Sequence, residues 1–107
     1  MFDIHQSCVV TGFSNSQFLI ASHIKPWAKS TNEEKIDPYN GLLLTPNFDK
    51  LFDKNLISID FKGNVLKSKI LQPSDIQFFQ LPKKVSFIFD SRHKKYLDYH
   101  NALVEEK

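Results

Sequence analysis

A short helix with Thr45 as its N-cap is predicted within residues 45–55, and this helix limits the folds that the chain can adopt. In TPNFDKLFDKN (45–55), Thr45 is a favoured N-cap residue, and Pro46 suits the first helical position because no partner is needed there for an N–H. Apolar residues then recur three and four positions apart on one face: Phe48, Leu51 and Phe52. Asp49 lies beside this stripe in the first turn, so its carboxylate is expected to face whatever packs in front of the helix.

A β-hairpin is predicted ahead of this helix. SCVVTG (7–12) is a β-branched run ending in glycine, FSNS (13–16) has turn composition, and QFLIAS (17–22) is interpreted as the returning strand. The second strand would end beside His23. Pro26 cannot continue a ladder, so the chain is expected to leave the sheet at that point.

Beyond the hairpin, the pattern predicts an α+β domain of mixed small elements. Residues 28–39 are predicted as a loop, and NGLLL (40–44) as a short buried turn or helical piece. Alternating apolar residues around Lys62-Gly63-Asn64 predict a second hairpin over 56–68. Two further helices are predicted, over 72–81 and over 91–106, and the second is amphipathic. The length favours a single domain over 1–107.

Composition narrows the class of protein. Apolar residues make up 41% of the chain, which is enough for a globular core, and the single cysteine excludes an internal disulfide or a site built on several thiolates. No apolar run is long enough to span a bilayer and no signal-peptide pattern is seen, so a cytoplasmic protein without membrane contact is expected. The net charge of +2 is compatible with a solvated surface or with phosphate binding.

Three segments in a fixed order carry a family resemblance: ASHIKPW (21–27), DPYNGLLL (37–44) and FDKLFDKNLIS (48–58). Together they make residues 8–60 resemble the HNH endonucleases, especially the restriction-enzyme-associated branch; YLDYHN (96–101) is similar to that branch as well. The resemblance implies a ββα-metal core, in which a β-hairpin packs on a helix. The second hairpin and a C-terminal helical extension over 72–106 would complete the domain.

The resemblance implies that His23 is the catalytic general base. An ordinary imidazole has a pKa of ~6.5, so near pH 7 it is mostly neutral and can accept a proton from water. The end of a strand gives such a base a fixed position with one open side. The alternative is a polar surface histidine without a catalytic role.

The metal would be held mainly by Asp49. Mg²⁺ prefers oxygen ligands and keeps several waters, so one carboxylate can suffice, and Mn²⁺ is an alternative ion. Asp49 could instead only stabilise the start of its own helix. Many family members carry Asp or His just before the catalytic histidine, whereas Ser22 stands there in this chain and would be a weak ligand.

The remaining site residues have supporting roles in this reading. Asn40 would fix the loop that positions His23, as the family resemblance implies, or act as a plain turn residue. Lys25 and Lys29 are candidates for DNA phosphate contacts. His100 is interpreted as a core or interface histidine. Asp53, one helical turn beyond Asp49, is interpreted as a capping or salt-bridge residue in preference to a metal ligand. Trp27 is interpreted as a packing residue that could stack on a base or support the His23 loop.

The expected function is a divalent-metal-dependent DNA endonuclease, of restriction type or the nuclease domain of such an enzyme. The alternative is a catalytically impaired HNH-fold module that binds nucleic acid, an idea that Ser22 favours. A colicin-like toxin is disfavoured because the basic excess is small. Each site attacks one strand, so double-strand cleavage would need a homodimer or two encounters, and an additional specificity domain is compatible with the early start of the motif core.

Overall fold

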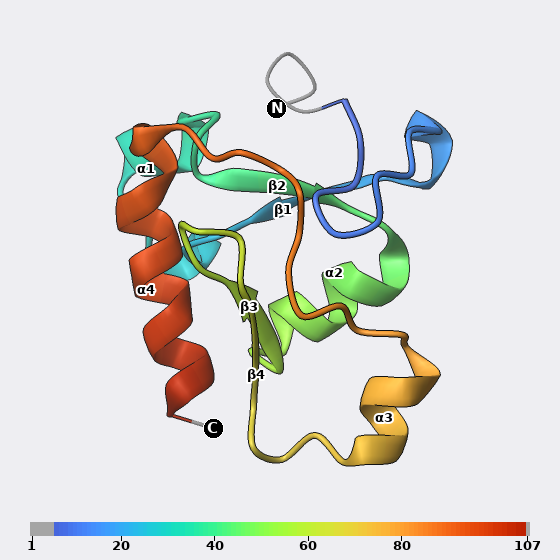
Figure 1. Cartoon of the computed structure of the whole chain (residues 1–107). Helices are drawn as coiled ribbons and strands as arrows, with labels where there is room; N and C mark the ends of the chain where they lie inside the picture. The colour runs from blue at the N-terminus through green and yellow to red at the C-terminus, as the bar shows by residue number, and fades with distance from the viewer. Residues whose placement is uncertain (1–5, 107) are drawn as a thin grey trace.

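The computed structural model describes residues 6–106 and has the expected α+β composition (Figure 1). The strands form two antiparallel pairs, β1 (Ile20–His23) with β2 (Gly41–Leu44) and β3 (Ile57–Ile59) with β4 (Val65–Lys67). The helices are α1 (Asn32–Ile36), α2 (Pro46–Asp53), α3 (Pro73–Phe78) and α4 (Lys94–Glu105), with short 3-10 turns at η1 (Ser16–Phe18), η2 (Trp27–Lys29) and η3 (Ser91–His93). The predicted second hairpin and the helices predicted over 45–55, 72–81 and 91–106 are confirmed.

The first hairpin was predicted with the wrong partner strand. Strand β1 pairs with β2, placing His23 opposite Gly41. Residues 8–13 instead form a tight turn, closed by a hydrogen bond of 2.8 Å from Cys8 N to Phe13 O. This turn is linked to the sheet by a hydrogen bond of 3.0 Å from Val9 N to Leu43 O. The turn closes too early for a ladder to form.

The segment predicted as a buried turn or helical piece is strand β2. All four residues of β2 are buried, so the run shows no alternation between a core face and a solvent face. A short, fully apolar run has the same appearance in a buried helix and in a buried strand. The structure corrects the interpretation to a strand.

The predicted loop over 28–39 also contains a structured element. Helix α1 is only five residues long and starts at a capping box, in which Thr31 and Glu34 each bond to the other's backbone N–H. Helices this short are marginal without outside support. The side chains of His23 and Asn40 provide that support, because they bond to the carbonyls of Lys35 and Glu34 in α1.

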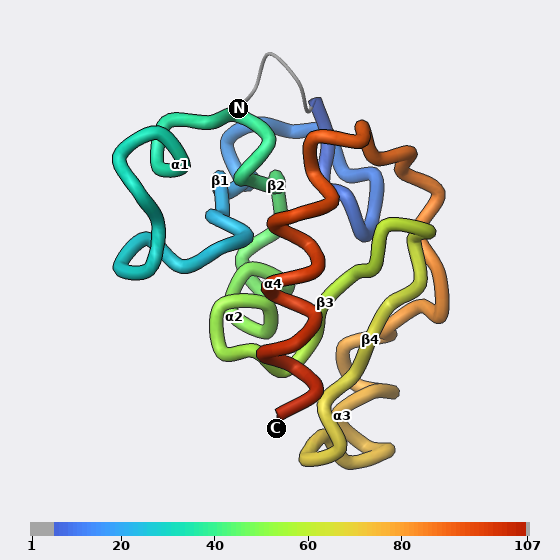
Figure 2. Tube along the Cα trace, turned by 90° about the vertical axis from the view of Figure 1, so that its left-hand side faces the viewer, coloured from blue at the N-terminus to red at the C-terminus, as the bar shows by residue number. Residues whose placement is uncertain are grey.

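Helix α2 packs against β1, β2 and β3, while α4 lies against the second hairpin (Figures 1 and 2). The order β1, β2, α2 is consistent with an HNH-type domain. The second hairpin turns at Gly63, whose φ of +92° favours glycine, and a Cβ there would lie 2.9 Å from the carbonyl oxygen of Val85. Over residues 6–106, none of the helices is both long and apolar enough to cross a bilayer.

Candidate functional site

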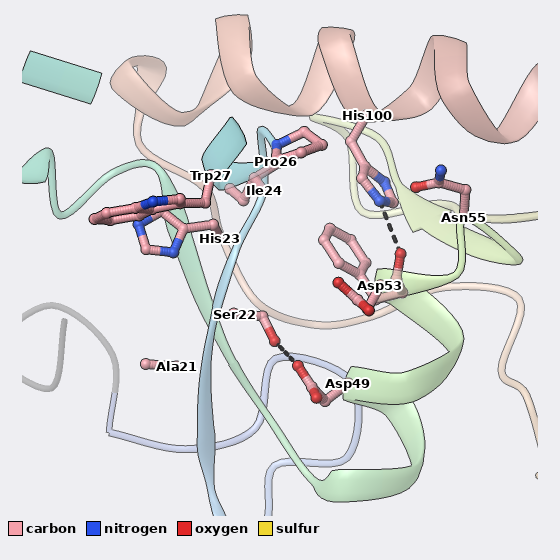
Figure 3. Close-up of a pocket in the computed structure, with 11 residues that line it drawn as sticks. Ala21, Ser22, His23, Ile24, Pro26, Trp27, Asp49, Asp53, Asn55 and His100 are labelled. Atoms are coloured by element: carbon pink, nitrogen blue, oxygen red, sulfur yellow. Dashed lines mark hydrogen bonds between the residues drawn. The ribbon is translucent and has the colours of Figure 1, made fainter. Parts of the chain in front are cut away.

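A pocket of about 300 Å³ opens where β1 ends and α2 faces it (Figure 3). Its lining comes from several elements that are far apart in the sequence. Ser22 and His23 come from β1, and Asp49 and Asp53 come from α2. Trp27, at the start of η2, and His100, from α4, also line it. The pocket therefore brings together residues of the first and the third motif.

His23 is held by the backbone at one ring nitrogen. Its Nε2 lies 3.0 Å from the carbonyl oxygen of Lys35, near the end of α1. A carbonyl can only accept, so Nε2 carries the hydrogen and Nδ1 keeps its lone pair. The ring also packs edge-to-face on Trp27 at 5.3 Å, and the Lys35 ammonium lies 4.6 Å from the centre of the Trp27 ring. One imidazole tautomer is thus selected, with an acceptor nitrogen available.

Asp49 is hydrogen-bonded to the strand that ends at His23. The hydroxyl of Ser22 donates a hydrogen bond to Asp49 Oδ1, and Ser22 itself is buried. Figure 3 shows Ser22 pointing toward Asp49, whereas His23 turns toward Trp27. Across the part of the chain described, His23 and Asp49 form neither a hydrogen bond nor an ion pair with each other. They share a pocket without direct contact.

Asn40 is completely buried, with 0% of its surface exposed, and its amide is fully used. Its Oδ1 accepts from the backbone N–H of Lys25 at 2.8 Å. Its Nδ2 donates to the carbonyl of Glu34 at 3.0 Å and to the hydroxyl of Ser30 at 3.3 Å. These bonds tie three points of the loop between β1 and β2 to the residue that enters β2.

The two lysines proposed to contact DNA differ in their surroundings. Lys25 forms an ion pair of 2.9 Å with Glu34, and both side chains are mostly buried. Its ammonium also lies 5.2 Å from the centre of the Tyr99 ring. Lys29 lies exposed in η2 and forms no ion pair within residues 6–106. Lys29 is therefore the more accessible cation.

For Asp53, the sequence interpretation ranked a structural role above metal binding. It was interpreted as a cap or salt-bridge residue, but its side chain makes neither contact anywhere in the described chain. It lies exposed on α2 and lines the same pocket as Asp49. Residues four apart on a helix share a face, so the spacing of the two aspartates was a usable signal.

The oxygen donors of the pocket fit a hard divalent cation. Asp49 and Asp53 offer carboxylate oxygens, and the Ser22 hydroxyl is already directed at Asp49. Within residues 6–106 no group of three or more His, Cys, Asp or Glu side chains could hold a metal ion. The donor set suits Mg²⁺ or Mn²⁺, which keep waters as ligands, better than an ion that needs a complete protein cage.

His100 lies at the inner wall of the pocket and is buried, as expected for a core histidine. Its Nε2 donates to the carbonyl of Phe52 at 2.9 Å, so its Nδ1 accepts from the Ser58 hydroxyl at 2.8 Å. The ring also stacks on the Phe52 ring at 3.7 Å. Burial lowers the pKa of His100 to about 4, which keeps the ring neutral.

We expect this buried histidine to make the domain sensitive to acid. Its pKa is about 4 in the folded chain, so the unfolded chain binds the proton first as the pH falls. The stabilisation is therefore complete above pH ~6.5 and lost between about pH 6.5 and 4, by an amount on the order of 3 kcal/mol. Denaturant unfolding across this range should show the loss, and His100→Gln should flatten it. Parallel pH profiles for both proteins would contradict the assignment.

Residues 8–60 match the model of the HNH endonuclease family. The match supports assignment of the chain to that family, as the three motifs implied, and it contains Ser22, His23, Asn40, Asp49 and Asp53. HNH nucleases generally use divalent metals, and the family implies a DNA substrate. No curated protein matches the chain.

Proposed function

We propose that the chain is a divalent-metal-dependent DNA endonuclease that hydrolyses phosphodiester bonds with His23 as general base. One observation carries the proposal: the Lys35 carbonyl fixes the hydrogen of His23 on Nε2, in a pocket that also holds Asp49. Neutral imidazole with a free Nδ1 is the form that accepts a proton from water. The HNH family match supports the same chemistry.

In the proposed reaction, a water gives its proton to Nδ1 of His23 while its oxygen attacks phosphorus. The bond from phosphorus to the 3′ oxygen breaks as the new bond forms, and the leaving oxygen takes a proton from solvent water to become a 3′ hydroxyl. When bound, a divalent cation supplies positive charge beside the phosphate oxygens. Asp49 and Asp53 would hold it, and the hydrogen bond from Ser22 would orient the Asp49 carboxylate rather than make Ser22 a ligand. Asn40 would keep the His23 loop in place, and Lys29 would attract the DNA backbone more than the ion-paired Lys25.

A catalytically impaired DNA-binding module is the second candidate. It is favoured by two observations: Ser22 stands beside the histidine, and residues 6–106 hold no cluster of three ligating side chains. Such a module would keep the fold and bind DNA without cutting it. The two candidates make different predictions for one assay.

We expect supercoiled plasmid to be nicked in Mg²⁺ or Mn²⁺ and to stay intact with chelator. Asp49→Ala should lower the rate about tenfold or more, because loss of a ligating carboxylate weakens metal binding. Asp98→Ala is the matched control, since Asp98 is an exposed aspartate that pairs with Lys94 on α4 outside the pocket. Retarded but uncut plasmid would favour the binding module.

The restriction-type role is a further part of the proposal. One pocket attacks one strand, so a double-strand break requires a homodimer, two encounters or a partner domain that reads the sequence. The ratio of nicked to linear plasmid at rising protein concentration distinguishes these cases. A mapped set of cleavage sites would show whether this chain has sequence preference by itself.

A further inference from the structure

Helix α4 is hydrogen-bonded to the turn that leads into β2. The hydroxyl of Tyr96, on α4, donates a hydrogen bond of 2.6 Å to Asp37 Oδ2 across 59 positions of sequence. Tyr96 is almost wholly buried, with 1% of its surface exposed. Figure 2 shows the chain passing close to the start of α4 just before it enters β2. Neither residue belongs to the proposed catalytic set.

Two more contacts join the same segments. The guanidinium of Arg92 lies 4.1 Å from the centre of the Tyr39 ring, and His93 packs edge-to-face on that ring at 5.1 Å. Residues 92, 93 and 96 therefore contact residues 37 and 39. Tyr96 is the member of this group that reaches Asp37 by a hydrogen bond.

Asp37 organises the turn that Tyr96 holds. Its backbone N–H donates to the carbonyl oxygen of Glu34, in α1, at 3.3 Å. Its Oδ1 accepts from the N–H of Tyr39 at 2.9 Å, and its carbonyl accepts from the N–H of Asn40 at 3.0 Å. One carboxylate oxygen of Asp37 is thus hydrogen-bonded within the turn, and the other is hydrogen-bonded to α4.

The turn lies between two residues placed against His23, one by a hydrogen bond to the ring and one by the strand register. Two residues before Asp37 is the Lys35 carbonyl, which accepts from Nε2 of His23. Four residues after Asp37 is Gly41, which faces His23 in the β1–β2 pair. A displacement of the turn would move both groups relative to the imidazole.

We propose that Tyr96 is a positioning residue for His23. Its hydroxyl anchors Asp37, and Asp37 in turn sets where the Lys35 carbonyl stands, so the tautomer of His23 depends on a helix outside residues 8–60, the segment that matches the family. The catalytic consequence rests on the proposed nuclease function. The effect on the tautomer of the His23 ring does not depend on that function.

Tyr96→Phe tests this link by removing only the hydroxyl. Tyr99→Phe is the matched control, because the Tyr99 hydroxyl has no hydrogen-bond partner in residues 6–106 and lies on the same helix. The first readout is the ¹⁵N spectrum of the His23 ring, which separates the Nε2–H tautomer from the Nδ1–H tautomer. We expect wild type and Tyr99→Phe to show mainly Nε2–H, and Tyr96→Phe to show a mixture.

The second readout is nicking by folded protein. We expect Tyr96→Phe to lower kcat about tenfold or more with little change in KM, because misplacement of a general base affects the chemical step. A wild-type tautomer and wild-type kcat in folded Tyr96→Phe would overturn the proposal. If no protein nicks DNA while Tyr96→Phe still alters the ring tautomer, the proposed function fails and the positioning role stands.

Discussion

His23→Ala is expected to slow plasmid nicking by about 10²–10⁴-fold, because it removes the group that takes the proton from the attacking water. The side chain is half-buried at the end of β1 and its one described hydrogen bond goes to a backbone carbonyl. We therefore expect unfolding free energy to fall by no more than about 1 kcal/mol. Initial nicking rates and denaturant curves on the same preparations check both parts.

Chemical rescue separates a missing base from a damaged pocket. The alanine variant leaves space beside Trp27, whose ring packs on the imidazole in the intact chain. Added imidazole can enter that space and act as a base from solution. We expect it to restore part of the nicking rate in His23→Ala and to leave the Asp49→Ala rate unchanged. Nicking by His23→Ala at the wild-type rate would exclude His23 as the base.

Local sequence signals predicted the elements that begin or turn at residues with strong conformational preferences. The helix at α2 was predicted from Thr45, Pro46 and its apolar stripe, and the structure places it at Pro46–Asp53. Gly63 lies in the turn of the second hairpin, as the Lys62-Gly63-Asn64 sequence indicated. The partner of β1 was missed because β2 is uniformly apolar and lies beyond a long loop. Strand pairing depends on tertiary packing that no short window contains.

Some residues of the candidate site were predicted from the sequence and some of its contacts were not, because those contacts depend on tertiary packing. Family motifs directed attention to His23, Asn40 and Asp49, and the chemistry of a neutral amide explains why Asn40 can both donate and accept. The hydrogen bond from Ser22 to Asp49 depends on how α2 packs against β1, and no local sequence pattern predicts that packing. The bond from Tyr96 to Asp37 spans 59 positions and has no local pattern at either end.

Asn40→Ala is expected to destabilise the domain by about 2–4 kcal/mol and to abolish most nicking by the protein that remains folded. The substitution leaves the N–H of Lys25 without its partner, and an unsatisfied group of this kind costs about 1–3 kcal/mol when buried. It also removes the amide donor from the Ser30 hydroxyl and from the Glu34 carbonyl, although that carbonyl keeps the N–H of Asp37. Denaturant unfolding gives the first effect, and kcat corrected for the folded fraction gives the second.

Asn64→Ala distinguishes general destabilisation from loss of the His23 loop. Asn64 also uses its amide inside the protein, donating to Asp60 Oδ2 at 2.9 Å, but in the turn of the second hairpin. We expect it to cost about 0.5–1.5 kcal/mol, the usual net value of one hydrogen bond, and to leave kcat unchanged. Because Asn40 bonds to the carbonyl of Glu34, the residue directly before Lys35, loss of its amide should alter the tautomer of His23 as well as the stability. Equal kcat in folded Asn40→Ala and Asn64→Ala would mean that the loop keeps its shape without the amide, and that Asn40 contributes stability alone.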